Sequence, residues 1–525
     1  MIEHFIFYLG LVLIILLAIM LANKMKIAYP ILLVIAGLLV SFAPGVPQTK
    51  IDPELIFIIF LPPLLYEAAF AVSWKELWKL RRIITNFAFV VVFLTALSVA
   101  FVTHSFIPGF SLALGFVLGG IVSPPDAVSA GAILKFIKVP KNLASLLEGE
   151  SLFNDASSLI IFRFAMVAVA TGQFIWQDAA LNFVWMVIGG VGIGLMLAFI
   201  FLKVHRIFPT DVNMDTVLTL VAPYIMYIVA EEVHASGVLS VVSGGLFLSV
   251  RRFQFLRTSE GRLKGANVWE SFAFLINGIV FLLIGLGLPE IMEGLQKDGI
   301  SLSTAINYGL LVTATLIIVR FFASYGAVGV TLLASRFIKV ADRNPGIKAP
   351  LLLSWTGMRG VVSLAAALSI PVQIDGMTFP YRNLILFITF IVILTTLIVQ
   401  GLTLPLIIKK LDLKDTGTHL SEEETEELIR TGMKHSAFKF LNEKYSTRKK
   451  GSKYLNKLMD QWEEQDKSES SFRIPDDTKD IYIEALNQQR EWLLEENKKN
   501  LKIDEEVVRR YLLKLDLEEE RIRIG

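Results

Sequence analysis

The chain has 525 residues, of which 54% are hydrophobic and 19% are charged, with a formal net charge of +2 and a mean hydropathy of +0.60. This composition excludes an ordinary soluble globular protein, and the near-neutral charge without a nucleic-acid motif argues against a nucleic-acid partner. The chain has no cysteine, which excludes disulfides and cysteine-ligated metal.

Thirteen apolar segments are long enough to cross a bilayer as helices, which takes about 17 to 25 residues. They lie near 5 to 22, 27 to 43, 55 to 72, 84 to 105, 111 to 134, 143 to 170, 181 to 202, 216 to 232, 237 to 250, 267 to 289, 304 to 335, 350 to 371 and 384 to 408. The first segment follows Glu3 and His4 rather than a basic leader, so we expect it to be retained. We therefore predict an all-α polytopic membrane protein.

Lys and Arg are concentrated in alternate loops. The loops after odd-numbered segments hold 23 of them, whereas the loops after even-numbered segments hold three: Lys50, Lys297 and Arg382. Because cytoplasmic loops carry the excess of positive charge, we expect an external N-terminus and a cytoplasmic C-terminus.

The composition changes after Leu411, where charged, helix-forming sequence replaces apolar sequence. We expect a transmembrane domain over residues 1 to 411 and a cytosolic helical tail over 412 to 525. The pattern Ser421-Glu-Glu-Glu424 is typical of a capping box, and further helices are expected at about 477 to 499 and 504 to 521. A solvated tail without a transport role, a regulatory tail and a dimer contact all remain open.

The segment from 143 to 170 is unusually polar for a membrane helix. Its ionisable and amide side chains are Glu148, Glu150, Asn154, Asp155 and Arg163. An ionisable residue near the bilayer centre costs about 2.5 to 3.5 kcal/mol, so such residues usually mark an ion pathway or a structural ion pair. Ser151 and Asp155 are four residues apart, which places their oxygens on one face of the helix.

Depth distinguishes these carboxylates. At about 1.5 Å per residue, Asp155 lies about 18 Å from the cytoplasmic end of its segment, near the middle of a hydrocarbon core of about 30 Å. Depth therefore selects Asp155 over Glu148. Arg163 lies near the outer end, where we expect its side chain to reach the interface.

Two segments carry helix-breaking sequences. Ser123-Pro124-Pro125-Asp126 contains two adjacent prolines, which remove backbone donors and clash with the preceding turn, so we expect a broken helix near mid-membrane; a simple kink is the alternative. Gly357-Met-Arg359-Gly360 interrupts the segment from 350 to 371.

The depths of the arginines predict their partners. Arg359 lies about 13 Å and Glu150 about 10 Å from the same end, so we expect these two residues to form a structural ion pair. We expect Arg320 to neutralise the carbonyl ends of the broken helices or Asp126. Ser151 has no His or Lys base in its segment, and the chain has no phosphate-binding glycine loop, so neither an enzyme nor an ATP-driven pump is expected.

Four motifs, in this order, resemble those of the sodium/proton antiporters in the electroneutral branch of the monovalent cation/proton antiporter superfamily. They are Pro62-Pro-Leu-Leu-Tyr-Glu67, Ser123-Pro-Pro-Asp126, Gly149-Glu-Ser-Leu-Phe-Asn154-Asp155 and Gly357-Met-Arg359-Gly-Val-Val-Ser-Leu-Ala. The resemblance covers residues 5 to about 410. It implies an inverted repeat of spans one to six and eight to thirteen, with spans five and twelve broken and crossing. It also implies a moving core at about 84 to 170 and 304 to 408, and a dimerisation scaffold at about 5 to 72 and 181 to 289.

The resemblance further implies a cation site. Its residues here are Asp155, Asn154, Ser151, Asp126, Glu67 and the carbonyl of Pro125, with Na+ held at Asp155, Ser151 and Glu67. Family members often have a proline after the aspartate of span five, whereas Ala127 follows Asp126 here. The resemblance implies a homodimer in the plasma membrane and no cofactor.

These features predict exchange of Na+, or of Li+ or K+, for H+ by alternating access. Burial disfavours the charged carboxylate of Asp155 and a bound cation favours it, so cation and proton compete for the same group. Asn154 leaves one carboxylate at the pair, which together with the resemblance favours electroneutral exchange. A K+/H+ antiporter is the alternative within transport, and a passive cation channel is the alternative from another class.

Overall fold

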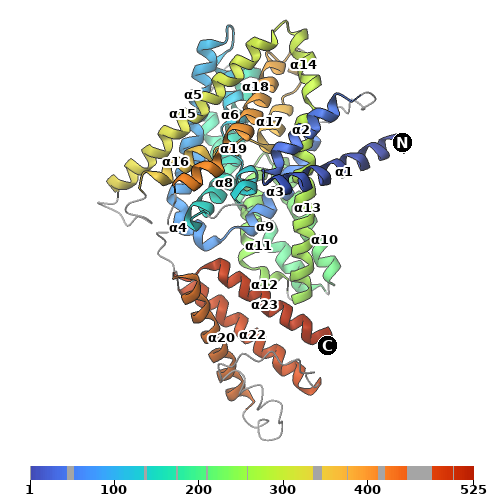
Figure 1. Cartoon of the computed structure of the whole chain (residues 1–525), viewed down its shortest axis with the longest axis vertical. Coiled ribbons are helices and arrows are strands. Elements are labelled where there is room, and N and C mark those ends of the chain that lie inside the picture. Colours follow the sequence, from blue (N-terminus) through green and yellow to red (C-terminus); the bar gives the residue numbers. More distant parts are fainter. Residues whose placement is uncertain are drawn as a thin grey trace. The chain divides into compact units, whose positions relative to one another are not determined.

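The computed structural model describes residues 2–43, 53–134, 139–172, 176–208, 211–256, 258–334, 346–374, 377–411, 420–445, 476–500 and 502–524. These residues form helices and one small antiparallel sheet, in which β1 (Gln373–Ile374) pairs with β2 (Met377–Thr378) (Figure 1). The chain divides into two compact units. The membrane unit comprises Met1–Ile207, Leu218–Arg252 and Trp269–Asp415, and the tail unit comprises Phe208–Val217, Phe253–Val268 and Thr416–Gly525.

The first helices along the chain are α1 (Ile2–Met25), α2 (Tyr29–Ser41), α3 (Pro53–Ala71), α4 (Trp74–Thr85), the π-helix η1 (Asn86–Val91), α5 (Val92–Phe106), α6 (Leu112–Val122), α7 (Ala127–Leu134) and α8 (Lys141–Thr171). They are followed by α9 (Trp176–Ile207), α10 (Val212–Glu232), α11 (Gly237–Val250), α12 (Arg252–Phe255), α13 (Ser259–Leu286), α14 (Leu288–Lys297) and α15 (Leu302–Ala334). The last helices of the apolar region are α16 (Lys348–Trp355), α17 (Val361–Leu368), α18 (Arg382–Thr395), the π-helix η2 (Thr396–Gln400) and α19 (Gly401–Leu411).

Among the described residues, eight helical runs are long and apolar enough to cross a membrane. Four shorter apolar helices accompany them: Tyr29–Ser41, Phe57–Ala71, Leu112–Val122 and Gly237–Val250. Each predicted segment coincides with one of these helices or with a pair separated by a break. The all-helical polytopic fold is therefore confirmed, while thirteen crossings stay a prediction.

Two regions predicted as loops contain amphipathic helices. In α4, the Ser73 hydroxyl accepts a hydrogen bond from the Glu76 amide at 3.2 Å, and Leu77 and Leu80 are buried on one face. In α14, Ile291 and Leu295 are buried in the same way. Hydropathy misses such helices because apolar residues cover only one side of them.

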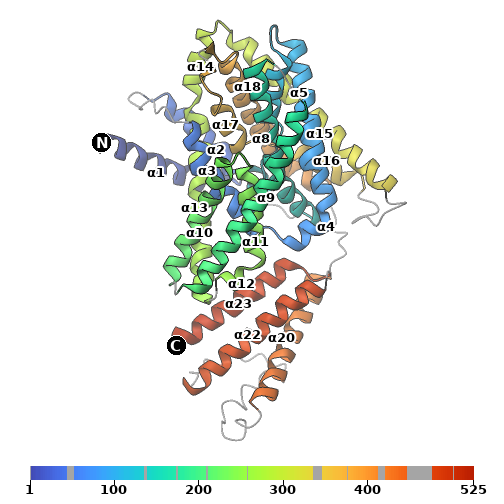
Figure 2. The ribbon, with the colours of Figure 1, turned by 180° about the vertical axis from the view of Figure 1, so that it is seen from behind.

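Both predicted helix breaks are present. Pro124 and Pro125 lie between α6 and α7, and residues 356–360 separate α16 from α17. Helix α6 packs closely against α8, because a Cβ at Gly120 would lie 2.8 Å from the backbone nitrogen of Phe162. Pro124, Pro125 and residues 356–360 are all buried, and α17 lies beside α18 in both opposite views (Figures 1 and 2). The breaks are therefore held in a packed interior.

The tail unit contains α20 (Glu422–Lys444), α22 (Asp476–Lys499) and α23 (Glu505–Ile524). The predicted capping box is confirmed, with the Ser421 hydroxyl and the Glu424 carboxylate each accepting from the other residue's amide. The three helices share a hydrophobic cluster that includes Ile429, Leu493 and Val507, and Phe253 packs against it. The predicted domain boundary at 411 and 412 adjoins residues 412–419, which lie outside the described residues.

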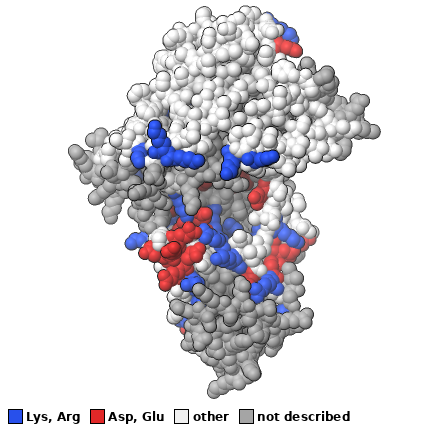
Figure 3. Space-filling model, viewed as in Figure 1, with Lys and Arg blue, Asp and Glu red and all other residues white. Residues whose placement is uncertain are grey.

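Charge is distributed unevenly over the membrane unit. In Figure 3, the Lys and Arg side chains on this face of the unit gather mainly along one edge, next to a surface with few charges. Basic loops that all lie on one side of a membrane would produce this arrangement. The orientation of the chain in the membrane stays a prediction.

Candidate ion-binding site

Helix α8 carries the predicted site residues into the interior. Asp155 is 7% exposed and Asn154 is fully buried, whereas Glu148, two turns earlier, is exposed. Ser151 lies one turn before Asp155 and is half-buried. The depth argument that selected Asp155 over Glu148 therefore agrees with the burial of the two side chains.

Asp126 lies at the break between α6 and α7 and caps the second helix. Its Oδ1 accepts a hydrogen bond from the Val128 amide at 3.1 Å, and its Oδ2 accepts from the Ser129 amide at 3.3 Å and from the Ser129 hydroxyl. A carboxylate at a helix N-terminus satisfies free amides and complements the helix dipole. The prolines open the helix, and Asp126 starts the next one.

Asn154 connects α8 to this break. Its Nδ2 donates to the carbonyl of Pro125 at 3.2 Å, while its Oδ1 is buried without a hydrogen-bond partner among the described residues. Asp126 and Asp155 are close enough to interact electrostatically. The break and α8 thus bring two carboxylates, one unpaired amide oxygen and one carbonyl into the same neighbourhood.

The two broken helices contact each other. The Asp126 amide donates to the Met358 carbonyl at 2.7 Å, and a Cβ at Gly360 would lie 2.1 Å from Asp126 Oδ2. No side chain fits at Gly360 without moving Asp126. The glycine in this motif therefore permits the close approach of the two breaks.

Arg359 binds backbone oxygens at the breaks. Its Nε donates to the Val122 carbonyl at 2.8 Å and its Nη2 donates to the Ser123 carbonyl at 3.3 Å. Its Nη1 donates to the Gly357 carbonyl. Arg359 is 1% exposed, and it neutralises the negative end of the α6 dipole.

Arg320 is the partner of Glu150, so the predicted ion pair between Glu150 and Arg359 is wrong. Arg320 Nη1 and Nη2 donate to the two Glu150 carboxylate oxygens at 2.7 and 2.9 Å, and its Nε donates to the Leu353 carbonyl at 3.0 Å. The two arginines have exchanged the predicted roles. The prediction used depth alone, and depth does not specify the direction in which a side chain leaves its helix.

Glu67 lies on α3, half-buried, and its main electrostatic neighbours are Glu148 and Glu270. Tyr29, at the start of α2, interacts with both Asp126 and Glu67. Tyr29 was not predicted, because a tyrosine at the start of an apolar helix is typical of a membrane interface. Among the described residues, no three His, Asp or Glu side chains are arranged to hold a metal ion, so a cation here would also need amide, hydroxyl or backbone oxygens.

Comparison with known proteins identifies the family. Residues 11–410 match the model of the sodium/hydrogen exchanger transmembrane family. The chain is 34% identical over 396 residues to the sodium, potassium, lithium and rubidium/H(+) antiporter of Bacillus pumilus, and the match covers 74% of this chain and 58% of that relative. It is 34% identical over 391 residues to the low-affinity Na(+)/H(+) antiporter NhaS1 of Synechocystis, with 74% and 70% covered.

The fold is similar to a solved structure. The sodium proton antiporter MjNhaP1 from Methanocaldococcus jannaschii aligns with a TM-score of 0.59 and 20% identity, over 78% of this chain and 99% of that chain. The match to the family model covers more than half of the chain and includes all four motifs. The chain is a multi-pass membrane protein that belongs to the sodium/hydrogen exchanger family, a family of transporters and not of enzymes.

Proposed function

We propose that this chain exchanges Na+, or Li+ or K+, for H+, and that cation and proton compete for Asp155 during alternating access. The observation that carries the proposal is that this carboxylate is buried without an ion pair. Asp155 is 7% exposed, and it forms no ion pair with Lys or Arg within the described part of the chain. A buried carboxylate without a permanent cation partner is neutralised by whichever ligand binds it.

The proposed cation site combines the groups around Asp155. Asp155, Ser151 and Glu67 would supply oxygens to Na+, and Asn154, Asp126 and the Pro125 carbonyl would complete or support the site. The unpaired Oδ1 of Asn154 supports this assignment, because a buried acceptor without a donor is suited to a cation. The Pro125 carbonyl already accepts a hydrogen bond from Asn154, which favours a positioning role for it.

The proposed stoichiometry is one cation for one proton. Glu150 is held by Arg320, and Asp126 accepts hydrogen bonds at the start of α7. Asp155 has neither an ion pair nor a cap among the described residues, and Asn154 leaves it as the one carboxylate of the Asn154–Asp155 pair. One exchangeable charge supports electroneutral exchange.

The proposed architecture follows the family. We place thirteen spans in the plasma membrane, with an inverted repeat, an external N-terminus and a cytoplasmic tail. The moving core is residues 84 to 170 and 304 to 408, and the scaffold that forms a homodimer is residues 5 to 72 and 181 to 289. The alternation of basic loops and the contact between the two breaks support this arrangement.

Proton flux in proteoliposomes tests the function. We expect Na+ to dissipate an imposed pH gradient in the wild type, with a rate that does not change when a membrane voltage is imposed. Asp155→Asn should abolish this flux, whereas Asp480→Asn, an exposed change on α22, should preserve it. Full activity of Asp155→Asn would refute the proposal.

The same assay separates the alternatives. The name of the Bacillus pumilus relative includes potassium, so a K+/H+ exchanger is the second candidate. Parallel series with Na+, Li+ and K+ rank the three ions. A passive cation channel would instead pass a current when voltage is stepped, and an electroneutral exchanger would not.

A further inference from the structure

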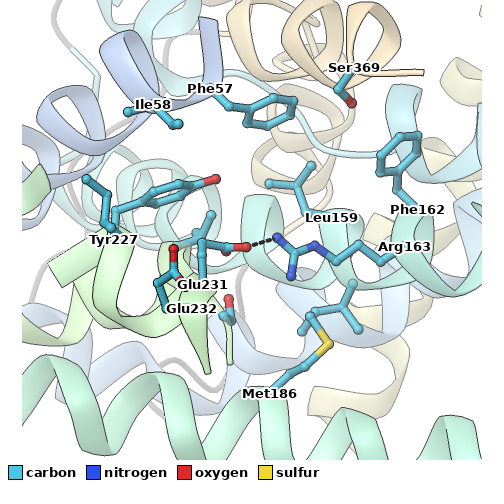
Figure 4. Close-up of a pocket in the computed structure, with 14 residues that line it drawn as sticks. Phe57, Ile58, Leu159, Phe162, Arg163, Met186, Tyr227, Glu231, Glu232 and Ser369 are labelled. Atoms are coloured by element: carbon cyan, nitrogen blue, oxygen red, sulfur yellow. Dashed lines mark hydrogen bonds and ion pairs between the residues drawn. The ribbon is translucent and has the colours of Figure 1, made fainter. Parts of the chain in front are cut away.

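We infer that the ion pair between Arg163 and Glu231 is a gate that closes a second route to Asp155, through a cavity on the side of Asp155 opposite to Glu148. This inference rests on the proposed function. Arg163 Nη2 donates to Glu231 Oε2, and Figure 4 shows the two side chains pointing at each other across the cavity. The sequence predicts that Arg163 reaches the membrane interface, and it gives no sign of this partner on α10.

The cavity has a volume of about 380 Å³ and lies within the membrane unit. Its lining comes from α8 and the segment after α17 on one side, and from α3, α9, α10 and α11 on the other. Leu159, Phe57 and Tyr227 make the lining mainly apolar, while Glu231 and Glu232 add carboxylates (Figure 4). The cavity therefore lies between the helix that carries Asp155 and the helices of the proposed scaffold.

The cavity is aligned with the proposed cation site. Ser151, Asp155, Leu159 and Arg163 are each four residues apart on α8, so neighbouring members of this row lie one turn apart, and the row winds around the helix by about 40° at each step. Leu159 lines the cavity and is one turn from Asp155, and Arg163 is one turn further. Asp155 itself does not line the cavity, so the inferred route requires a cation to pass Leu159 before it reaches Asp155.

The packing around α8 indicates which boundary can open. On the side of α6 and η1, α8 is closely packed, with Gly120 against Phe162 and the Ser157 hydroxyl donating to the Ala88 carbonyl. On the opposite side it faces the cavity. Movement of α8 relative to α10 would therefore break fewer contacts than movement relative to α6.

The ion pair is suited to opening and closing. The side chains of Arg163 and Glu231 are 40% and 26% exposed, and ion pairs with this exposure are weak. Glu231 Oε1 also accepts from the Gly237 amide at 3.0 Å, which fixes this carboxylate to the start of α11. When Arg163 moves away, Glu231 and Glu232 would face the cavity together and attract cations.

Cysteine labelling tests the gate without depending on transport. Because the chain has no cysteine, Leu159→Cys supplies a single thiol in the cavity. We would measure its reaction with a charged, membrane-impermeant methanethiosulfonate that is added from the side opposite the tail, in right-side-out vesicles. Adding Arg163→Met or Glu231→Gln should raise the labelling rate by about two- to fivefold. Glutamine retains an oxygen for the Gly237 amide and loses only the charge.

Three controls make the result specific. Arg163→Lys keeps the charge and should label like the parent, and the exchanged pair Arg163→Glu with Glu231→Arg should return the rate toward it. Lys264→Met breaks an exposed ion pair within α13 and should have no effect. Equal rates in all variants, absence of labelling throughout, or an equal effect of Lys264→Met would overturn the gate. Na+-dependent proton flux of the wild type is measured separately, so its absence refutes the proposed function and not the gate.

Discussion

The two units of the molecule treat buried charge in opposite ways. In the tail unit, Arg262 donates to both carboxylate oxygens of Asp516 at 2.9 and 2.5 Å, and Arg490 donates to Asp516 at 2.8 Å and to Glu519 at 3.0 Å. All four side chains are at most 7% exposed. Each of these four buried charges thus has a partner of opposite charge.

The membrane unit leaves part of its buried charge without a permanent partner. Glu150 has Arg320, and Arg359 binds carbonyl oxygens, but Asp155 has no ion pair among the described residues. A closed charge cluster is a structural device, because every group keeps its partner. A buried carboxylate without a permanent ion pair can bind a proton and a cation in turn. The two units differ in this respect.

The tail cluster shows what the tail helices contact. Arg262 lies near the start of α13, and Asp516 lies on α23. The tail helix α23 therefore contacts the first turns of α13, so this face of the tail is buried and does not face solvent. Ser259 adds a hydrogen bond to Glu520 at 2.6 Å within the same unit.

Breaking the ion pair between Glu150 and Arg320 should cause the largest loss of stability. Glu150→Gln or Arg320→Met leaves a buried charge without its partner, which should cost about 3 to 5 kcal/mol of stability. Thermal unfolding in detergent measures this loss. The double variant Glu150→Met with Arg320→Met should recover most of it, because it removes both charges; a single variant as stable as the wild type would contradict the assignment.

Removing the arginine that binds carbonyl oxygens should have a smaller effect. Arg359→Met leaves the buried carbonyls of Val122 and Ser123 without this hydrogen-bond donor. This change should lower the free energy of unfolding by about 1 to 3 kcal/mol. Arg359→Lys keeps a charge near the break and should recover part of this loss. The measurement is again thermal unfolding, and equal stability of the Met and Lys variants would show that the charge does not matter there.

The tail cluster should tolerate the loss of one arginine better than the Glu150 pair. After Arg262→Met, Asp516 still has Arg490 as a partner, so we expect a loss of about 1 to 2 kcal/mol that is confined to the tail unit. Limited proteolysis of α23 should accelerate while proton flux is retained. Lys264→Met is the matched control, and loss of flux in Arg262→Met alone would show that the cluster takes part in transport.

A fall in pH should destabilise the tail unit, and this effect should be the smallest of the four. Burial raises the pKa of Glu519, but hydrogen bonds and charges from Arg523 and Arg490 outweigh burial, so its pKa is lowered overall. A lowered pKa in the folded state stabilises the fold above the ordinary glutamate pKa, and this stabilisation is lost as pH falls through the lowered value. Hydrogen exchange of α23 should therefore quicken at acid pH, and Glu519→Gln should weaken that dependence.

Much of the membrane fold could be predicted from the sequence, because apolar runs have to be long and the pair Pro124-Pro125 interrupts its helix. Adjacent prolines alone do not ensure a break, since Pro62 and Pro63 lie inside the continuous helix α3. The breaks at Pro124 and Gly357 and the burial of Asp155 were predicted in this way. Partners were not predicted, because hydropathy specifies depth and not the direction of a side chain. Arg320 therefore replaced Arg359 as the partner of Glu150, and Arg163 gained Glu231.

The contact between the tail and the start of α13 had no signal in the sequence. Arg262 and Asp516 are 254 residues apart, and neither lies in a motif. Charged residues in a helical tail usually face solvent, so their composition indicates exposure. In the structure these particular charges are buried because each finds a partner from another helix.

Proton release on cation binding tests the shared carboxylate most directly. When Na+ is added to the purified wild type in weakly buffered detergent solution, we expect release of about one proton per chain, because the cation displaces the proton from Asp155. Asp155→Asn should release none, and Asp480→Asn should behave like the wild type. Proton release of wild-type size from Asp155→Asn would contradict competition at this residue.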